Sequence, residues 1–316
     1  MHRFTLRHFA RALAAAIALA AAAQSVLADT VLKVGDQQSQ IRGILEASGQ
    51  LKDVPYRIEW FNFPAAQPLG EALNAGAIDV GAIGDAPAIF LYAAGAKVRA
   101  VAAMRTTPTG LAIVVPDASP IRSAADLRGK RIATTRGSIG HYLVVAALER
   151  AGLKPSDVSL RFMQPVDAQA ALASGDIDAW SSWDPYVALA EQRHHERSIA
   201  NGVNLSPGLG FEVATDAAIR TKRTALADFL KRVAAGQRWA LAHPEQVAAI
   251  QSKVTGLPAD VLQIVYRRAQ LHPVDIDDRV IADQQKTADL YLRADVIKTR
   301  IDVAPSFDRQ FPLDAH

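Results

Sequence analysis

The sequence of 316 residues contains no cysteine, which excludes thiol catalysis, disulfide bonds and a lipid-anchored cysteine. Half of the residues are hydrophobic and 21% are charged. A chain of this length buries roughly three quarters of its extended-chain surface, so a hydrophobic core can form without a disulfide or a structural metal. The ordinary contents of 19 Gly and 16 Pro, together with the mixed charge, exclude collagen, a coiled coil and wholesale disorder.

The sequence also lacks a long uncharged apolar run outside its first residues. Arg3, Arg7 and Arg11 precede an alanine-rich stretch at residues 12–23, and small side chains follow up to Ala28. This pattern predicts a secretory signal peptide over residues 1–28. The stretch is too short to span a bilayer, and no later uncharged run reaches the ~20 residues required. We therefore expect a soluble, exported protein, most simply a periplasmic one.

The chain shows no excess of one charge once this segment is removed. The predicted signal peptide carries three of the 35 basic residues and none of the 32 acidic residues, so the mature chain is formally neutral. A nucleic-acid partner requires clustered, uncompensated Lys and Arg. We expect no nucleic-acid binding.

The sequence contains an internal repeat. Residues 72–87 and 171–186 align without a gap at an offset of 99 residues. The alignment matches Gly76 with Gly175, Ile78 with Ile177, Asp79 with Asp178 and Asp85 with Asp184. Each copy has the pattern of a helix stopped by Gly, a short strand, and a loop whose Asp favours the start of a helix. Strand patterns at 31–34 and 130–133, each followed by a polar loop and a helix, repeat at nearly the same offset.

Strands that alternate with amphipathic helices predict parallel sheets of the α/β class, here in two similar lobes. Buried-strand patterns at 110–115 and 210–214 are interpreted as the two connections between the lobes. We predict that lobe 1 comprises residues 29–112 and 213–316 and that lobe 2 comprises residues 113–212. The region after residue 214 has helical periodicity and is expected to pack on lobe 1, with helices at 224–242, 244–255, 258–270 and 277–292.

Parallel α/β sheets bind ligands at the carboxyl ends of their strands, so two facing lobes would line one cleft. From lobe 1 we expect the lining residues Gln37, Gln38, Ser39, Gly84, Asp85 and Ala86. From lobe 2 we expect Gly137, Ser138, Ile139, Gly140, His141, Trp183, Asp184 and Tyr186.

The segment 136–141 carries the clearest chemistry. A glycine-bearing loop at the start of a helix exposes unpaired N–H groups and the positive end of the helix dipole, which together form an anion site. Ser138 adds a hydroxyl, and His141, on the same helical face, can donate as well. The alternative is that Ser138 is a plain N-cap. Trp183 is predicted to form a wall for an apolar part of the ligand, Trp180 to lie in the core, and Asp85 and Asp184 to cap helices.

Two further clusters do not support catalysis or metal binding. His194, His195 and Glu196 are adjacent, so on a helix they point in different directions, and no further ligand is evident. Ser138, His141 and Asp184 do not suit a triad, because Ser and His in successive turns of one helix start lack independent approach to a carbonyl. We therefore predict that the protein is not an enzyme and uses no metal or cofactor.

Four segments, at 77–87, 127–133, 136–143 and 175–186, resemble the periplasmic substrate-binding proteins of ABC importers, specifically the aliphatic sulfonate, taurine and nitrate group. The resemblance extends from about Val31 to Leu292. It implies a type II binding protein with two crossover strands, which closes on a small organic anion and delivers it to an inner-membrane permease with an ATPase partner.

The resemblance also implies roles for individual residues. The sulfonate would meet Gly137, Ser138 and Gly140, with His141 and Gln38 as further donors, whereas Trp183 and residues 84–86 would face the organic tail. Two positions depart from the pattern of relatives, which often have a neutral residue where Asp85 stands and Lys where Gln38 stands. A ligand that carries an amine or hydroxyl, or a different oxyanion, therefore remains an alternative.

Other ligands and other classes of protein stay open at this point. The alternative ligands are taurine, nitrate or bicarbonate, and a thiamine-precursor pyrimidine. The alternative classes are an enzyme on the same scaffold and a ligand-sensing module of a receptor, which would need a tethering transmembrane helix that we do not find. We expect a monomer that binds an aliphatic sulfonate.

Overall fold

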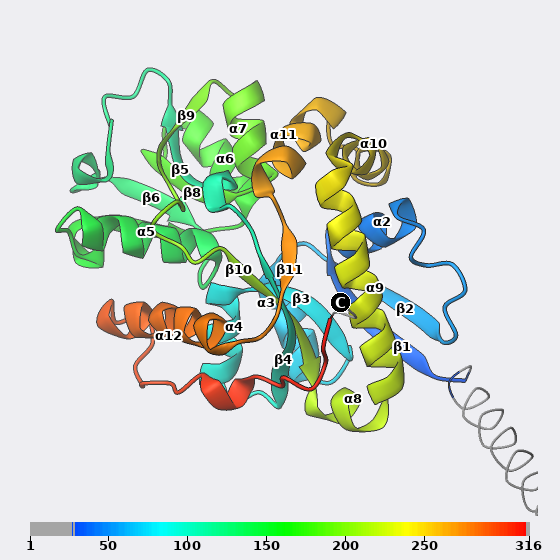
Figure 1. The fold of residues 1–316 in the computed structure, drawn as a ribbon. Helices are drawn as coiled ribbons and strands as arrows, with labels where there is room; N and C mark the ends of the chain where they lie inside the picture. The colour runs from blue at the N-terminus through cyan, green and yellow to red at the C-terminus, as the bar shows by residue number, and fades with distance from the viewer. Residues whose placement is uncertain (1–26, 28, 314–316) are drawn as a thin grey trace, which may run out of the picture.

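Two mixed β-sheets form the centres of two lobes in the computed structural model, which describes residue 27 and residues 29–313 (Figure 1). Apart from Leu27, the predicted signal peptide lies outside the described residues. The first sheet has the order β11-β4-β10-β3-β1-β2 and the second the order β7-β6-β8-β5-β9. The first contains β1 (Val31–Gln37), β2 (Arg57–Phe63), β3 (Val80–Gly84), β4 (Val98–Arg105), β10 (Leu209–Thr215) and β11 (His272–Val274). The second contains β5 (Leu111–Pro116), β6 (Arg131–Thr134), β7 (Ser159–Phe162), β8 (Ala179–Trp183) and β9 (Glu196–Asn201).

Helices cover both faces of each sheet. The helices of the first two thirds of the chain are α2 (Gln40–Ala47), α3 (Ala66–Asn74), α4 (Asp85–Ala93), α5 (Ile139–Arg150), α6 (Pro165–Ser174) and α7 (Tyr186–Arg193). In the first lobe, α3 and α4 share a core with one face of the sheet and α2 with the other. In the second lobe, α5 covers one face, while α6 and α7 cover the other, where Trp180 is buried as expected. The predicted two-lobed α/β fold is confirmed.

The repeated residues Asp79 and Asp178 form the same hydrogen bonds in the two lobes. The Asp79 carboxylate accepts the N–H of Lys33 at 2.7 Å, and the Asp178 carboxylate accepts the N–H of Arg131 at 2.8 Å. In each lobe the N–H of the Asp also donates to the carbonyl of that partner. The start of β3 is thereby joined to β1, and the start of β8 to β6, both parallel pairs. The repeat therefore encodes one structural unit that is used twice.

The strands expected at 110–115 and 210–214 are β5 and β10, and each lies antiparallel within its own sheet. The chain passes between the sheets just before them, at residues 106–110 and 202–208. The predicted lobe boundaries, at 112/113 and 212/213, fall inside these two strands. We propose that the boundaries instead lie in the two connecting segments.

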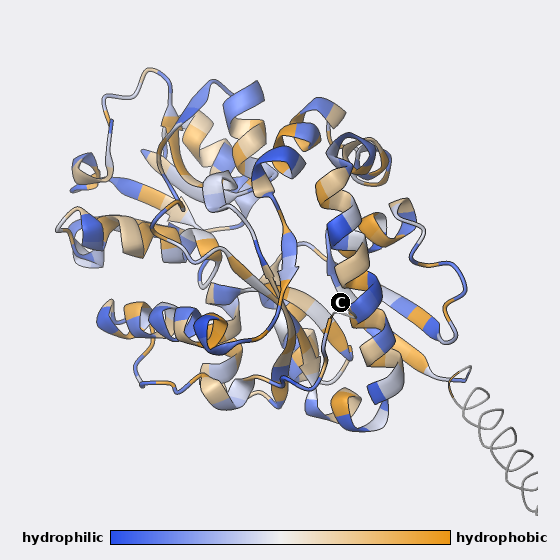
Figure 2. Cartoon of the chain, in the orientation of Figure 1, coloured by the Kyte–Doolittle hydropathy of each residue, from blue (hydrophilic) through white to orange (hydrophobic). Residues whose placement is uncertain are grey.

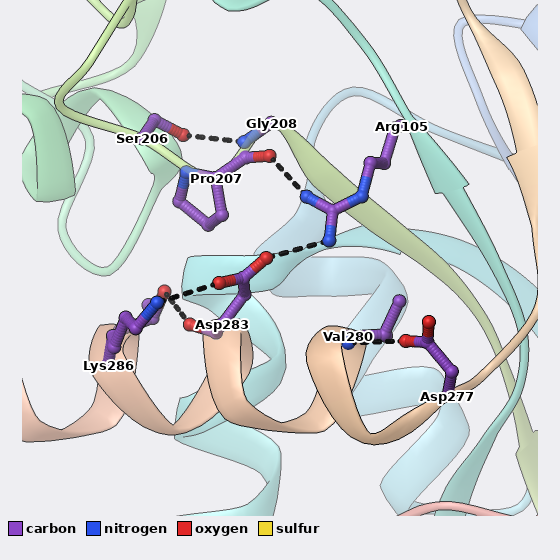
Figure 3. A network of polar contacts seen from close by, with 9 residues as sticks. Arg105, Ser206, Pro207, Gly208, Asp277, Val280, Asp283 and Lys286 are labelled. Carbon is purple, nitrogen blue, oxygen red and sulfur yellow. Dashed lines mark hydrogen bonds and ion pairs between the residues drawn. The ribbon is translucent and has the colours of Figure 1, made fainter.

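One arginine ties both connecting segments to the C-terminal region (Figure 3). Arg105, at the end of β4, donates to the carbonyl of Pro207 at 3.1 Å and to the carboxylate of Asp283 at 2.7 Å. The N–H of Thr106 donates to the carbonyl of Gly208 at 2.8 Å, so the two segments lie side by side. A change in the angle between the lobes has to pass through this paired hinge.

The C-terminal helices occur close to the predicted positions: α9 (Arg223–Ala242), α10 (Pro244–Thr255), α11 (Ala259–Ala269) and α12 (Asp278–Arg293), preceded by the short α8 (Asp216–Thr221). Figure 2 shows apolar and polar residues alternating along α9 and α12. The helices pack on lobe 1 as expected, but they also reach lobe 2, because α11 contacts α7 and α12 contacts both α4 and α5 (Figure 1). Within the described part of the chain, no helix combines the length and the apolar character needed to cross a bilayer.

We expect Asp178→Ala to lower the free energy of unfolding by about 1–3 kcal/mol, because both the N–H and the guanidinium of Arg131 lose their acceptor. Asp176→Ala, which removes an exposed carboxylate two residues away, serves as the control and should change this free energy by less than about 0.5 kcal/mol. Urea unfolding followed by circular dichroism measures both. Equal effects of the two substitutions would contradict the assigned role of the repeated Asp.

Candidate ligand-binding site

Two adjoining cavities lie between the lobes, with volumes of about 480 and 300 Å³. They share the lining residues Gln37, Gln38, Gln40, Ile83, Gly84, Ile139, Trp183 and Asp184. The larger cavity extends along α3 and α4 to the loop before α5. The smaller cavity extends to β10, α10 and α11. The shared residues come from the carboxyl ends of strands in both sheets and from the helix starts that follow them, where parallel α/β folds bind ligands.

The structure brings most of the predicted site residues to this cleft. The larger cavity is lined by Gln37, Gln38, Gly84, Gly137, Ser138, Ile139, Trp183 and Asp184, and the smaller one adds Asp85. Ser39 and Tyr186 line neither cavity. Ala86, Gly140 and His141 also line neither, because each is buried: Ala86 within α4, Gly140 against β8 and His141 beside Phe162 and Tyr291.

The first turn of α5 combines an N-cap with open amides. Ser138 is the N-cap, and its hydroxyl oxygen accepts the N–H of His141 at 3.2 Å. The N–H of Ser138 donates to the carbonyl of Thr135 at 3.1 Å. The N–H groups of Ile139 and Gly140 have no acceptor within the described residues. These two amides therefore carry the positive end of the helix dipole without a partner.

His141 and Gly137 satisfy each other. The N–H of Gly137 donates to Nδ1 of His141 at 3.2 Å, which places the ring proton of a neutral imidazole on Nε2. Burial, aided by the nearby Arg136, lowers the pKa of His141 to about 4. His141 therefore remains neutral at neutral pH and fixes the loop. Gly137 has a φ of 73°, and a Cβ there would lie 2.9 Å from Phe90, so this position requires glycine.

At the equivalent helix start in lobe 1, the amides already donate to a carboxylate of the protein itself. The register of the repeat, in which Lys33 corresponds to Arg131, places Asp36 at the position of Thr134. The carboxylate of Asp36 accepts the N–H groups of Ile41 and Arg42, in the first turn of α2, at 3.1 and 2.9 Å. Thr134 offers only an uncharged hydroxyl, which has no hydrogen-bond partner among the described residues. Lobe 1 thus supplies its own anion to a helix start, whereas lobe 2 leaves the matching place open.

A cation that the sequence analysis did not select also lines the larger cavity. Arg136 lies just before Gly137, and its guanidinium carbon is 3.9 Å from the centre of the Phe162 ring. Among the described lining residues of both cavities, Arg136 is the one Lys or Arg side chain. The position of Arg136 immediately before the glycine-bearing loop is the sequence feature that could have identified it as a site residue.

The larger cavity also has apolar lining residues. Trp183, at the end of β8, and Phe90, on α4, line it together with Ile83, Pro87 and Leu91. The rings of Trp183 and Tyr186 meet edge to face at 6.0 Å. An uncharged hydrocarbon group fits these apolar side chains, while the start of α5 supplies unpaired amide donors.

The lobes touch across the cleft. Gln38 donates from Nε2 to the Tyr186 hydroxyl at 2.7 Å, which joins the loop after β1 to the start of α7. A Cβ at Gly84 would lie 3.0 Å from a methyl carbon of Ile139. The structure therefore shows the two lobes in direct contact at the cleft.

The two repeated carboxylates of the cleft differ in their partners. Asp85 is the first residue of α4 and caps no amide beyond its neighbour Ala86. Burial raises the pKa of Asp85 to about 7, and its Oδ2 has no partner within the described residues. Asp184 accepts the N–H of Ala188 at 3.1 Å and forms an ion pair with Arg268, so it stabilises the first turn of α7 as expected.

A further carboxylate, which the sequence analysis missed, lies in the first sheet. Glu212, on β10, is 1% exposed, and neither carboxylate oxygen has a hydrogen-bond partner among the described residues. Burial and the neighbouring Asp36 raise the pKa of Glu212 to about 8. Burial also raises the pKa of Asp36 to about 6. Glu212 is therefore held mainly as the neutral acid at neutral pH.

Within the described part of the chain, no group of three or more His, Asp or Glu side chains is arranged to hold a metal ion.

Glu212→Gln should reduce the loss of stability on raising the pH. Between pH 4.5 and about 8, an unfolded chain releases the Glu212 proton and the folded protein keeps it, so wild-type stability falls as the pH rises. The amide side chain of the variant has no proton to release, and the variant should gain about 2–4 kcal/mol relative to wild type between pH 5 and pH 8. Chemical unfolding at both pH values measures this gain. The exposed Glu59→Gln is the control, and a gain of the same size there would refute the assignment.

Comparison with known proteins identifies the family of the chain. A family model described as NMT1/THI5 like matches residues 64–247. A protein of Escherichia coli (strain K12) named for binding aliphatic sulfonates is 34% identical over 276 residues, which cover 86% of each chain.

Solved structures give the same relationship. The alkanesulfonate-binding protein from Xanthomonas axonopodis pv. citri bound to MOPS superposes with a TM-score of 0.84 at 31% identity, covering 89% of this chain and 99% of that one. The periplasmic aliphatic sulphonate binding protein from Escherichia coli superposes with a TM-score of 0.78 at 33% identity, covering 90% and 94%. The chain therefore belongs to the NMT1/THI5-like family and, within it, groups with the aliphatic sulfonate-binding proteins.

Proposed function

We propose that the protein captures an organic sulfonate in the cleft between its lobes and delivers it to the permease of an ABC importer. The sulfonate group would lie at the start of α5, and the organic part would lie against Trp183 and Phe90. Capture would take place in the periplasm, after removal of residues 1–28, and the protein would act as a monomer beside its membrane partners.

One observation carries the proposal: Ile139 with its open amide, Ser138 with its hydroxyl and Arg136 with its charge all line the larger cavity, and the open amide of Gly140 follows in the same helical turn. An anion leaves water only where fixed donors replace its hydration. A helix start supplies such donors without reorganisation, and the nearby guanidinium adds a full positive charge. The names of the relatives, which refer to aliphatic sulfonates, support the same ligand class.

The energetics require no covalent step. Micromolar affinity corresponds to about −8 kcal/mol, which a few charge-assisted hydrogen bonds and modest apolar burial can supply after the entropy of association is subtracted. Closure of the lobes covers the organic part and creates a surface that a permease can distinguish from the open form. The hinge formed by the two connecting segments provides the motion.

Asp85 favours an aminosulfonate such as taurine as a second candidate ligand. Asp85 lines the smaller cavity, and its buried Oδ2 has no partner within the described residues. An ammonium group on the ligand would satisfy that oxygen.

We expect 1-butanesulfonate at about 100 times its Kd to raise the Tm of the mature protein by roughly 5 °C or more, since ligand linkage adds about 2.7 kcal/mol of stability. Thermal shift should be measured with 1-butanesulfonate, taurine, nitrate, bicarbonate and an aminopyrimidine. Stabilisation by nitrate, bicarbonate or the pyrimidine, with no response to either sulfonate, would overturn the proposed ligand class. A larger shift with taurine than with 1-butanesulfonate would select the second candidate.

Ser138→Ala should raise the Kd for 1-butanesulfonate about fivefold or more, because the bound anion loses a hydroxyl donor. Loss of an N-cap also destabilises a helix, so a matched control is needed. Thr215 caps α8 in the same way, through the N–H of Ala218 at 3.1 Å, is equally buried and lines neither cavity. Thr215→Ala should leave the Kd unchanged in calorimetric titration. An unchanged Kd in Ser138→Ala would remove Ser138 from the site.

A further inference from the structure

Asp184 lies where an anionic ligand would meet repulsion. It lines both cavities, and its side chain is only 13% exposed. Glu71 and Asp85 also line the cleft, against Arg136 as the one lining cation among the described residues. A partly buried carboxylate interacts strongly with a nearby charge, since water screens it poorly. An anion can occupy this cleft only if the charge of Asp184 is compensated.

Arg268, on α11, supplies that compensation. Its Nε donates to Oδ2 of Asp184 at 2.7 Å, and its Nη2 donates to Oδ1, so the guanidinium grips both oxygens of the carboxylate. Its Nη1 donates to Glu191 at 2.8 Å, and the Arg268 side chain is 19% exposed. Arg268 lines neither cavity, so it acts on the cleft through Asp184.

A glycine in the first connecting segment leaves space for the ion pair between Arg268 and Asp184. Gly110, at the end of the first connecting segment, would bring a Cβ to 2.0 Å from Oδ2 of Asp184 and to 3.2 Å from Nε of Arg268. Any larger residue there would displace the pair. Gly110 and Arg268, which are far apart in the sequence, therefore serve the same contact with Asp184.

We propose that Arg268 is a specificity-determining residue, which admits an anion to the cleft by neutralising Asp184. This inference rests on the proposed function, since it assumes that the ligand is an anion. The guanidinium is a positioning and charge-compensating group that does not touch the ligand.

A purely mechanical role makes a different prediction. The C-terminal helices connect the lobes, because α10 packs on α2 of lobe 1 and α11 packs on α7 of lobe 2. If the pair only held these elements together, removing either partner would break it and weaken ligand binding alike. If Arg268 acts by compensating charge, the two removals have opposite effects on an anion.

The test is calorimetric titration of the mature protein and four variants with 1-butanesulfonate. Arg268→Gln exposes the ligand to an uncompensated carboxylate, and its Kd should rise about tenfold or more. Asp184→Asn keeps an oxygen for the N–H of Ala188 and removes the negative charge, so its Kd should equal or fall below that of wild type. The double variant should return to within about threefold of wild type, since neither charge remains. The control is Arg267→Gln, on the same helix as Arg268, which breaks an exposed ion pair with Glu245 of α10 and should stay within about twofold of wild type.

The outcomes distinguish failure of the proposed role of Arg268 from failure of the proposed function. A weaker Kd in Asp184→Asn, or a double variant as weak as Arg268→Gln, would overturn the inference and leave the proposed function standing. Failure of wild type to bind either 1-butanesulfonate or taurine would overturn both. Circular dichroism and the Tm without ligand check folding, and if Arg268→Gln does not fold, the Kd of Asp184→Asn alone decides between the charge and mechanical roles.

Discussion

The open start of α5 is the constraint on which the account of this molecule depends. A helix start that faces a cleft attracts anions only while its amides remain unpaired and its position is held. Three contacts hold it: Ser138 caps the third amide, Gly137 donates to His141, and the Tyr291 hydroxyl donates to the carbonyl of Ser138 at 3.2 Å. Because Tyr291 belongs to α12, the C-terminal region helps to place the site that the second lobe carries.

The internal repeat explains why the cleft has one such place and not two. Both lobes use the same strand, loop and helix, and both use an Asp to join two parallel strands. They differ at the helix start. In lobe 1 the carboxylate of Asp36 accepts the first amides of α2, whereas in lobe 2 Thr134 offers no such acceptor to the first amides of α5. The same divergence appears at the second pair of Asp residues, since Asp184 has acquired Arg268 and Asp85 has no ion-pair partner among the described residues. A duplicated framework thus supports an asymmetric cleft.

Local patterns accounted for much of this structure. The repeat identified Asp79 and Asp178 as equivalent, and helical periodicity placed α9 and α10 to within one residue. Contacts between segments that are distant in the sequence could not be predicted from these local patterns. Arg268 pairs with Asp184 from 84 residues away, and Glu212 becomes buried only when β10 enters the middle of the first sheet. His141 was expected to donate to a ligand, but the loop geometry turns its Nδ1 toward Gly137, and no sequence pattern reports that direction.

The most direct test of the central claim is a crystal structure of the mature protein with 1-butanesulfonate. We expect a sulfonate oxygen about 2.7–3.2 Å from the amide nitrogen of Ile139 or Gly140, with the butyl chain against Trp183. A sulfonate bound elsewhere in the cleft, with these two amides directed away from it, would contradict the account.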